Sequence, residues 1–223
     1  MLVVKVSRLR FAPGDKPMAV RSSQASSTYL RRLASAFGAG QEQLARSMHD
    51  AHVETSRTSQ QLKATLQALN ELTEQRKGDL RPAYNAFVSE VGKTEAAATQ
   101  TRSRVQWMSG DGRQYFREWQ NSINTISNES LKKKAQKRLN SVQKSYNEVE
   151  ESLKVAAEKF KPFLSDLADI KTALATDITA GGVKAIRGTV RTANWDHQFV
   201  DKAVNSALKE MGKMEKALTP QAT

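Results

Sequence analysis

The feature that most constrains the fold is a run of apolar residues, from Ala135 to Leu174, whose spacing alternates between four and three residues. This is the a/d pattern of a heptad repeat, which places such side chains along one side of a single α-helix. Forty residues of helix are about 60 Å long, too long to be buried in a small globule. The seam therefore predicts partner helices of similar length. Its twelve positions are Ala135, Leu139, Val142, Tyr146, Val149, Leu153, Ala156, Phe160, Phe163, Leu167, Ile170 and Leu174.

Three other stretches carry comparable seams and predict long helices over about 41–76, 80–126 and 183–218. Glycine, serine, asparagine and aspartate, which end helices or cap the next one, separate the predicted helices. These turn residues fall at 77–79, 127–130 and 180–182. We therefore predict an all-α fold.

Three irregularities interrupt these seams. Thr55 and Thr58 fall on the seam of the first helix and weaken its middle. The Ser-Gly-Asp-Gly stretch at 109–112 shifts the register of the second helix by one residue, which predicts a bulge or kink. Pro162 lies inside the third helix, where proline costs about 3 kcal/mol and bends the axis. Because the seam continues through Pro162, we predict one kinked helix rather than two.

Short connections make neighbouring helices antiparallel. The second and third helices then form an elongated antiparallel hairpin or coiled coil, and the shorter first and fourth helices join it at the end containing Gly78 and Gly181. We expect a four-helix bundle at that end and a two-helix tip, over about residues 105–145, at the other. The predicted domains are a basic, poorly ordered arm with a short helix near its end, an elongated helical domain and a tail, over residues 1–40, 41–218 and 219–223.

Composition excludes several classes of protein. The chain has no cysteine, so a disulfide scaffold, a thiolate metal site and a cysteine nucleophile are ruled out. No apolar run is long enough for a transmembrane helix. Lys5, Arg8 and Arg10 interrupt the first apolar run, so we expect no signal peptide. Cytoplasmic and envelope-associated locations both stay open.

The net charge of +12 is concentrated in two regions. Residues 1–46 hold eight Lys/Arg and two Asp/Glu, and residues 100–145 hold ten Lys/Arg and three Asp/Glu. Cations in the first turns of a helix oppose its dipole, so a role in contacting an anion and a solvated face both stay open for the cluster at 132–138. Trp107, Tyr115, Phe116 and Trp119 lie in the second region and are expected to be exposed there. The predicted contact residues are Arg113, Arg117, Lys132, Lys133, Lys134, Lys137 and Arg138.

Three blocks of the sequence resemble a bacterial family known only as domain of unknown function 2959. They are GDLRPAYNAF (78–87), FREWQNSINTISNESLKKKAQKRL (116–139) and EKFKPFLSDLADIKTAL (158–174). The resemblance covers roughly residues 40–215. It implies an all-helical coiled-coil protein, often with an N-terminal lipoprotein-type signal, although this chain has no cysteine to carry a lipid. It implies no catalytic residues.

The histidines do not form a convincing catalytic or metal-binding set. His49 and His52 are three residues apart on one helix and could bind a metal, but solvated surface histidines are the favoured interpretation. His197 is expected to pair with Asp201 on the seam of the fourth helix. No convergent group of histidine, acid and nucleophile is present, so we expect no enzymatic activity, no cofactor, no bound metal and no small-molecule substrate.

Two hypotheses for function follow from these patterns. In the first, the protein is a non-enzymatic coiled coil that contacts an anionic membrane surface through its basic tip, or self-associates through its long seam. In the alternative, the same cations bind nucleic acid without sequence preference, since no helix-turn-helix, RNA-recognition or zinc-finger motif is present. Homo-oligomerisation is open under either hypothesis.

Overall fold

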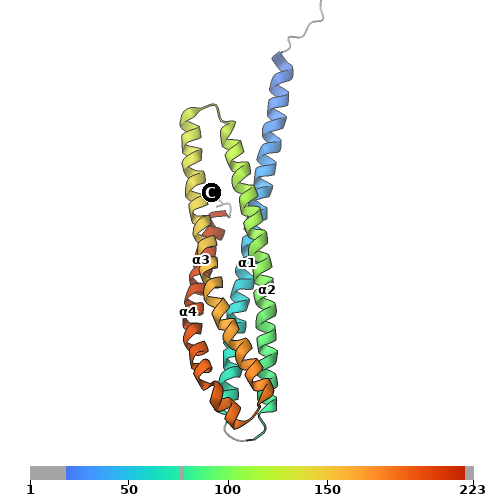
Figure 1. Cartoon of the computed structure of the whole chain (residues 1–223). Helices are drawn as coiled ribbons and strands as arrows, with labels where there is room; N and C mark the ends of the chain where they lie inside the picture. The colour runs from blue at the N-terminus through green and yellow to red at the C-terminus, as the bar shows by residue number, and fades with distance from the viewer. Residues whose placement is uncertain (1–18, 76–77, 219–223) are drawn as a thin grey trace, which may run out of the picture. The chain divides into compact units, whose positions relative to one another are not determined.

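Four long α-helices make up the computed structural model, which describes residues 19–75 and 78–218, with side chains from residue 38 onward. They are α1 (Ala19–Glu74), α2 (Arg81–Asn124), α3 (Glu129–Thr176) and α4 (Ala180–Leu218), shown in Figure 1. The described residues contain no strand, so the predicted all-α fold is confirmed. The chain divides into two compact units, Met1–Ala36 and Phe37–Thr223, and the following description concerns the second.

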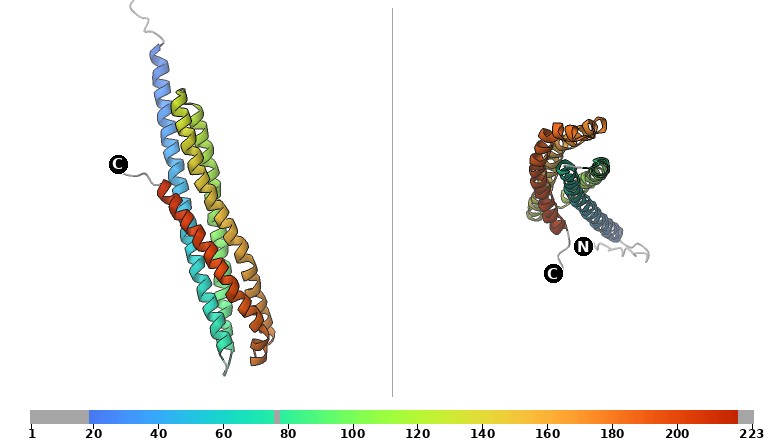
Figure 2. Two further views of the ribbon diagram at one scale, coloured as in Figure 1. Left: turned by 90° about the vertical axis from the view of Figure 1, so that its left-hand side faces the viewer. Right: turned by 90° about the horizontal axis from the view of Figure 1, so that it is seen from below.

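Within this unit each helix packs against two others. α3 packs along α2 and α4. Hydrogen bonds connect α1 to α2 through Thr58 and Thr101, and α1 to α4 through Asn70 and Asn194. The result is the predicted antiparallel α2–α3 hairpin, with α1 and α4 completing a four-helix bundle (Figure 2, right).

The bundle core consists of two apolar clusters that follow one another along the helices. The first lies toward the α1–α2 and α3–α4 connections and includes Leu69, Phe87 and Phe163. The second lies toward the α2–α3 connection and includes Met48 and Met108. Ten of the twelve predicted seam positions of α3 are buried, and the other two, Ala135 and Phe160, pack partly buried against these clusters. The heptad prediction for α3 is confirmed.

The predicted two-helix tip is wrong in its extent. The second cluster contains buried residues from all four helices, including Leu44, Tyr115, Tyr146 and Leu218, so the four-helix packing continues well into residues 105–145. The reason is helix length. At 1.5 Å per residue, the 39 residues of α4 are only about 14 Å shorter than the 48 residues of α3. Within the second unit, packing by α2 and α3 alone is therefore confined to the ends of these helices at their connection.

The expected interruption at residues 109–112 does not take the form of a bulge. α2 is continuous through these residues, and Gly112 is buried in the seam. A Cβ at Gly112 would overlap the ring of Tyr146, whose hydroxyl donates a hydrogen bond to the Met108 carbonyl at 3.0 Å. Met108, Gly112 and Tyr115 thus keep the four-three spacing. Phe116 and Ile123, which follow the shifted spacing, are buried as well, so the predicted register shift is present within an unbroken helix.

α1 begins before the predicted start at Gln41. It runs from Ala19 and continues through Gly38 and Gly40, so the predicted short helix at 29–37 is part of it. A Cβ at Gly40 would lie 3.2 Å from Glu118 Oε2, so glycine permits a close approach of α1 to α2 there. The parts of the predicted arm and tail at 1–18 and 219–223 lie outside the described residues.

The connection between α1 and α2 and the one between α2 and α3 follow the predictions. Gly78 adopts a φ of 93°, which favours glycine, in the turn after α1. Asp79 Oδ1 accepts a hydrogen bond from Arg81 N at 3.0 Å at the start of α2. Asn128 Oδ1 accepts one from Leu131 N, also at 3.0 Å, and caps α3 as predicted.

The α3–α4 connection differs from the prediction. Gly181 and Gly182 were expected to close the third helix, but α3 ends at Thr176 and both glycines lie in the first turn of α4. Thr179 Oγ1 accepts a hydrogen bond from Gly182 N at 3.2 Å and so caps α4. A Cβ at Gly182 would overlap the Asp177 carbonyl, which requires glycine at this close turn. Pro162 lies inside α3, which is a single helix as predicted.

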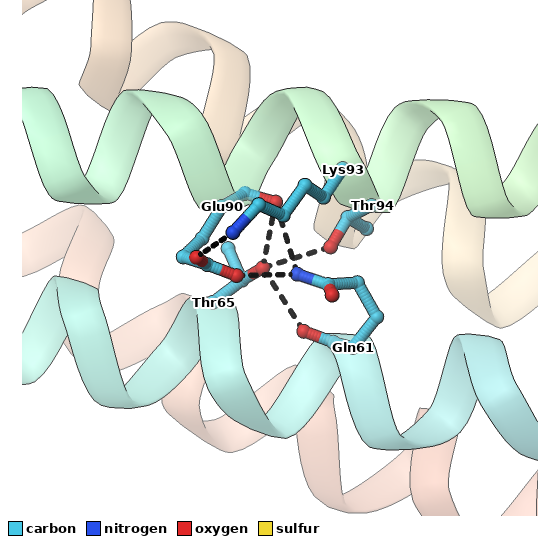
Figure 3. Close-up of polar contacts among 5 residues, drawn as sticks. All are labelled: Gln61, Thr65, Glu90, Lys93 and Thr94. Carbon is cyan, nitrogen blue, oxygen red and sulfur yellow. Dashed lines mark hydrogen bonds and ion pairs between the residues drawn. The ribbon is translucent and has the colours of Figure 1, made fainter.

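The α1–α2 interface is held by hydroxyl and carboxyl groups as well as by apolar contacts. Thr65 and Thr94 are fully buried, with their hydroxyl oxygens 2.8 Å apart, and Thr65 donates to the Glu90 carbonyl at 3.1 Å (Figure 3). The Glu90 carboxylate accepts from Gln61 Nε2 at 2.7 Å and from Lys93 Nζ at 2.6 Å. These contacts join the two helices at one axial position.

The two threonines that were predicted to weaken α1 are buried in the same interface. Thr58 Oγ1 lies 2.9 Å from Thr101 Oγ1 on α2, and Thr55 Oγ1 donates to the Ala51 carbonyl at 2.7 Å. Both hydroxyl groups are therefore satisfied. The stretch of the α1 seam that was predicted to be weak is therefore a hydrogen-bonded layer of the core.

Candidate functional site

The seven predicted contact residues, called here the tip cations, lie near the end of the hairpin where α2 and α3 are connected. Arg113 and Arg117 are on the last three turns of α2, and the other five are within the first ten residues of α3. Six are exposed, and Lys132 is half-buried. None forms an ion pair within the part of the chain whose side chains are described. The structure therefore brings the predicted residues together with their charges uncompensated by close contacts.

Two of the three acidic residues in this region are engaged by amides rather than by cations. Glu118 Oε1 accepts a hydrogen bond from Gln114 Nε2 at 2.9 Å. Asp111 Oδ2 accepts one from Gln43 Nε2 of α1 at 3.3 Å. Since neutral amides occupy these carboxylates, the positive field of the tip cations is not quenched by a neighbouring salt bridge.

A shallow hollow of about 370 Å³ lies between α2 and α3 at the tip. Arg113 is oriented beside it, because its Nη1 donates to Ser109 Oγ at 2.8 Å and Ser109 donates in turn to Glu150 Oε1 at 2.7 Å. Guanidinium and amide groups suit the oxygens of phosphate or carboxylate groups. The Glu150 carboxylate sits at the same hollow and limits how much negative charge it can accept. The hollow is lined by Arg113, Phe116, Arg117, Gln120, Leu139, Gln143, Tyr146, Asn147 and Glu150.

The aromatic residues of this region are mostly part of the core, which corrects the expectation that they are exposed. Tyr115 and Phe116 are buried, with ring centroids 5.3 Å apart, and Trp119 is half-buried. Burial raises the pKa of Tyr115 to about 12, although the Arg138 guanidinium opposes the rise. Of the four, only Trp107 is exposed, at 59%, and the Arg104 guanidinium lies over its ring. The tip thus offers cations without exposed aromatic rings beside them.

The histidines contribute to helix packing. His49 Nδ1 and His52 Nδ1 of α1 lie 3.4 Å and 3.2 Å from the Glu215 carboxylate of α4. The His197 ring lies 6.2 Å from the Phe163 ring in a tilted arrangement, and burial lowers the pKa of His197 although the Asp201 charge opposes the shift. Within the described residues no group of three or more histidine and acidic side chains is arranged to hold a metal.

Asp201 makes a different contact from the one predicted. Its ion pair is with Lys63 of α1, at 3.4 Å, rather than with His197. The contact joins α1 to α4, as the contacts of Glu215 do. His197 is close enough to feel the Asp201 charge, so the two residues are neighbours on α4 but not the predicted hydrogen-bonded pair.

A second basic surface lies on α4, where it was not predicted because the cations are dispersed along the sequence among acidic residues. All seven Lys/Arg residues of α4 are exposed, whereas its acidic residues are half-buried. A helical projection of residues 180–218 would have revealed this separation. We call this surface the α4 outer face; it comprises Lys184, Arg187, Arg191, Trp195, Phe199, Lys202, Lys209, Lys213 and Lys216.

A family model described as "Protein of unknown function (DUF2959)" matches residues 35–218, which is most of the chain and agrees with the resemblance seen in the sequence. No curated protein and no solved structure matches the chain. None of the described helices contains a stretch both long and apolar enough to cross a membrane.

Proposed function

Since the chain belongs to DUF2959, a family without a known activity, we propose from the geometry that it is a non-enzymatic interaction protein that contacts an anionic membrane surface through its hairpin tip. The observation that carries the proposal is the group of seven tip cations near the α2–α3 connection of the hairpin, without ion pairs in the described part of the chain. Two packed helices hold these charges in fixed relative positions, which suits adsorption to a charged surface.

Electrostatics sets the strength expected of such a contact. A Lys or Arg near an anionic lipid surface contributes about 1 kcal/mol, and the contribution falls off within a Debye length of about 8 Å at physiological salt. Several tip cations acting together would give reversible, salt-sensitive binding. This is the behaviour of a peripheral protein rather than of an inserted one.

Co-sedimentation with vesicles tests the proposal. The full chain should pellet with vesicles of phosphatidylcholine mixed with phosphatidylglycerol and stay in solution with phosphatidylcholine alone. The triple variant Lys132→Glu, Lys133→Glu, Lys134→Glu should bind at least about tenfold more weakly, since it reverses three contributions of about 1 kcal/mol each. Circular dichroism should show unchanged helicity, because these side chains are at the surface.

The matched control reverses three charges on the same helix, away from the tip. Lys154→Glu, Lys159→Glu, Lys161→Glu changes the net charge by the same amount at exposed positions of α3. Equal loss of binding in both variants would mean that net charge alone matters, and would contradict a tip contact.

Nucleic acid is the competing anion. If duplex DNA releases the protein from vesicles and binds it more tightly at the same salt concentration, the tip is a nucleic-acid surface instead. Failure of the wild-type chain to bind anionic vesicles refutes the membrane proposal outright. Self-association is measured separately by sedimentation equilibrium without vesicles.

A further inference from the structure

α4 carries a basic stripe along its outer side. At 100° per residue, its seven Lys/Arg residues fall within about 80° of the helix circumference, and they extend over about 48 Å from Lys184 to Lys216. All seven are exposed. Figure 2, left, looks onto this helix, coloured orange to red, which crosses the front of the bundle.

Three of the four acidic residues of α4, all except Glu210, are directed toward its neighbours. Asp201 pairs with Lys63 of α1, and Glu215 contacts His52 of α1. Burial and repulsion from Asp196 raise the pKa of Asp166 on α3, which places Asp196 on the α3 side. These acidic groups of the helix therefore face other helices, whereas its basic groups face outward.

The outward cations are largely uncompensated. Glu210 lies at the margin of the stripe and pairs with Lys213 at 2.7 Å. The other six cations form no ion pair within the described side chains. The α4 outer face thus presents a row of free positive charges to whatever lies beside the bundle.

Two aromatic rings interrupt this row near its middle. Trp195 is 60% exposed and Phe199 is 45% exposed, and their ring centroids are 5.6 Å apart with the planes at 69°. They lie on the same side of the helix as the cations, within an arc of about 120°. Neither ring is a member of the two apolar clusters of the core. A pair of exposed aromatic rings on a basic helix face is suited to contact with an apolar phase.

We propose that the α4 outer face is a second, separate membrane-binding surface, whose cations contact anionic lipid headgroups while Trp195 and Phe199 enter the interfacial region of the bilayer. A helix with a basic polar side and Trp or Phe among the cations is the type that lies in the membrane interface. Aromatic rings are also enriched at this depth of a bilayer. The inference goes beyond tip adsorption, since it concerns another helix and includes insertion of side chains.

Other occupants fit this surface less well. A second copy docking through the same face would bring like charges together, which disfavours a symmetric contact. Bases of a single-stranded nucleic acid stack on ring faces that follow the strand, whereas Trp195 and Phe199 lie edge to face against each other. An anionic lipid bilayer offers negative headgroups to the cations of this surface and an apolar phase to its two rings.

Tryptophan fluorescence tests insertion at the proposed site directly. The chain contains three tryptophans, so the variant Trp107→Phe, Trp119→Phe leaves Trp195 as the only one. On titration with vesicles of equal parts phosphatidylcholine and phosphatidylglycerol, the emission of Trp195 should shift to shorter wavelength. Lipids brominated on their acyl chains should quench it. Phosphatidylcholine vesicles alone should produce neither effect.

Binding measurements with truncated side chains provide the second test. Trp195→Ala, Phe199→Ala keeps every charge but should weaken binding to the mixed vesicles by at least about tenfold, because two inserted rings are removed. The matched control is Trp107→Ala, which removes an equally exposed tryptophan from α2 and should leave the affinity unchanged. A third variant, Arg187→Glu, Arg191→Glu, Lys202→Glu, should remove both the binding contribution and the spectral shift of Trp195.

The outcomes separate this inference from the tip proposal. Vesicle binding that is lost with the tip triple variant, while Trp195 shows no shift and its truncation has no effect, would overturn the α4 inference and keep the tip. Binding that survives the tip variant and is lost with Trp195→Ala, Phe199→Ala would do the reverse. A Trp195 shift caused by DNA but not by vesicles would also overturn the inference.

Discussion

Along α3 the residues that face neighbouring helices are apolar, whereas the corresponding side of α1 is partly hydroxylated. All ten buried residues of α3 are aliphatic or aromatic. The buried polar residues of the bundle are Ser47, Thr55, Thr58, Ser59 and Thr65 on α1, together with Thr94 on α2. Burial of apolar side chains is non-directional, so it permits one helix to slide along another. Hydrogen bonds between buried hydroxyl groups, in contrast, form at only one axial position of the two helices. We infer that burial of the α3 seam contributes most of the stability, and that the hydrogen bonds of the α1–α2 interface fix the axial position of α1 relative to α2.

Truncation of the α3 seam should produce the largest effect. Phe163 is fully buried among residues of the first cluster, so Phe163→Ala should lower the free energy of unfolding by about 3–5 kcal/mol through lost burial and a residual cavity. Urea denaturation followed by circular dichroism measures this change. Phe199→Ala, at an exposed position of α4, is the control and should cost less than about 0.5 kcal/mol. A similar cost for both would contradict the assignment of stability to the seam.

The glycine in the α2 seam should be the next most sensitive position. Gly112→Ala should destabilise the protein by about 1–3 kcal/mol, because the added methyl group overlaps the Tyr146 ring. Gly92 lies on the same helix with open space around it, so Gly92→Ala should stabilise by about 0.5–1 kcal/mol through helix propensity. Thermal melts of the two variants should shift in opposite directions. A shift in the same direction would mean that Tyr146 moves aside without cost.

The threonine pair offers a test of the register argument. Thr65→Val should cost about 1–2 kcal/mol, because the Thr94 hydroxyl loses its buried partner, whereas Thr65→Val, Thr94→Val should lie closer to wild type. The double-mutant cycle, measured by urea denaturation, should give a coupling of about 1 kcal/mol. Thr99→Val, at an exposed position of α2, serves as the control. Additive costs at Thr65 and Thr94 would show that the two hydroxyl groups do not act as a unit.

The smallest effect is expected at Glu90, which borders the same pair. Hydrogen bonds from Lys93 and Gln61 lower the pKa of Glu90 below its ordinary value of 4.5. A lowered folded-state pKa means that this stabilisation is fully present above pH 4.5 and is lost as the pH falls through the folded-state value. Since the carboxylate is partly exposed, the contribution should be below about 1 kcal/mol. Urea titrations between neutral and acidic pH should show that Glu90→Gln reduces the loss of stability in acid.

The sequence predicted the α3 helix well because four-three spacing of large apolar residues has no other common explanation. It misjudged Gly112, since a glycine that receives the Tyr146 ring contributes no hydrophobic signal of its own. It interpreted Thr55 and Thr58 as weak points because a buried threonine looks polar until its partner, here Thr101, is known.

The two candidate surfaces also differ in how well the sequence predicts them. The tip cations were predicted because five of them are clustered within seven residues of sequence, from Lys132 to Arg138. The α4 outer face was missed because its cations are spread over more than thirty residues and are mixed with four acidic ones. Only the folded helix separates the two signs, by directing Asp201 and Glu215 toward α1. The charge of a helix surface therefore depends on where each residue lies around the helix as much as on the composition of the local sequence.

The contact between α1 and α4 also has a consequence for the order of folding. Asn70 and Asn194 exchange side-chain hydrogen bonds across 124 residues, and Gln41 Nε2 donates to the Leu218 carbonyl across 177 residues. Such long loops close late and slowly compared with the α2–α3 hairpin, whose arms are joined by a short turn. Until α4 has been synthesised, the apolar sides of α1 and α3 that receive it remain in contact with water. We therefore expect a chain that lacks α4 to expose an apolar groove and to be prone to aggregation, which docking of α4 prevents by covering that groove.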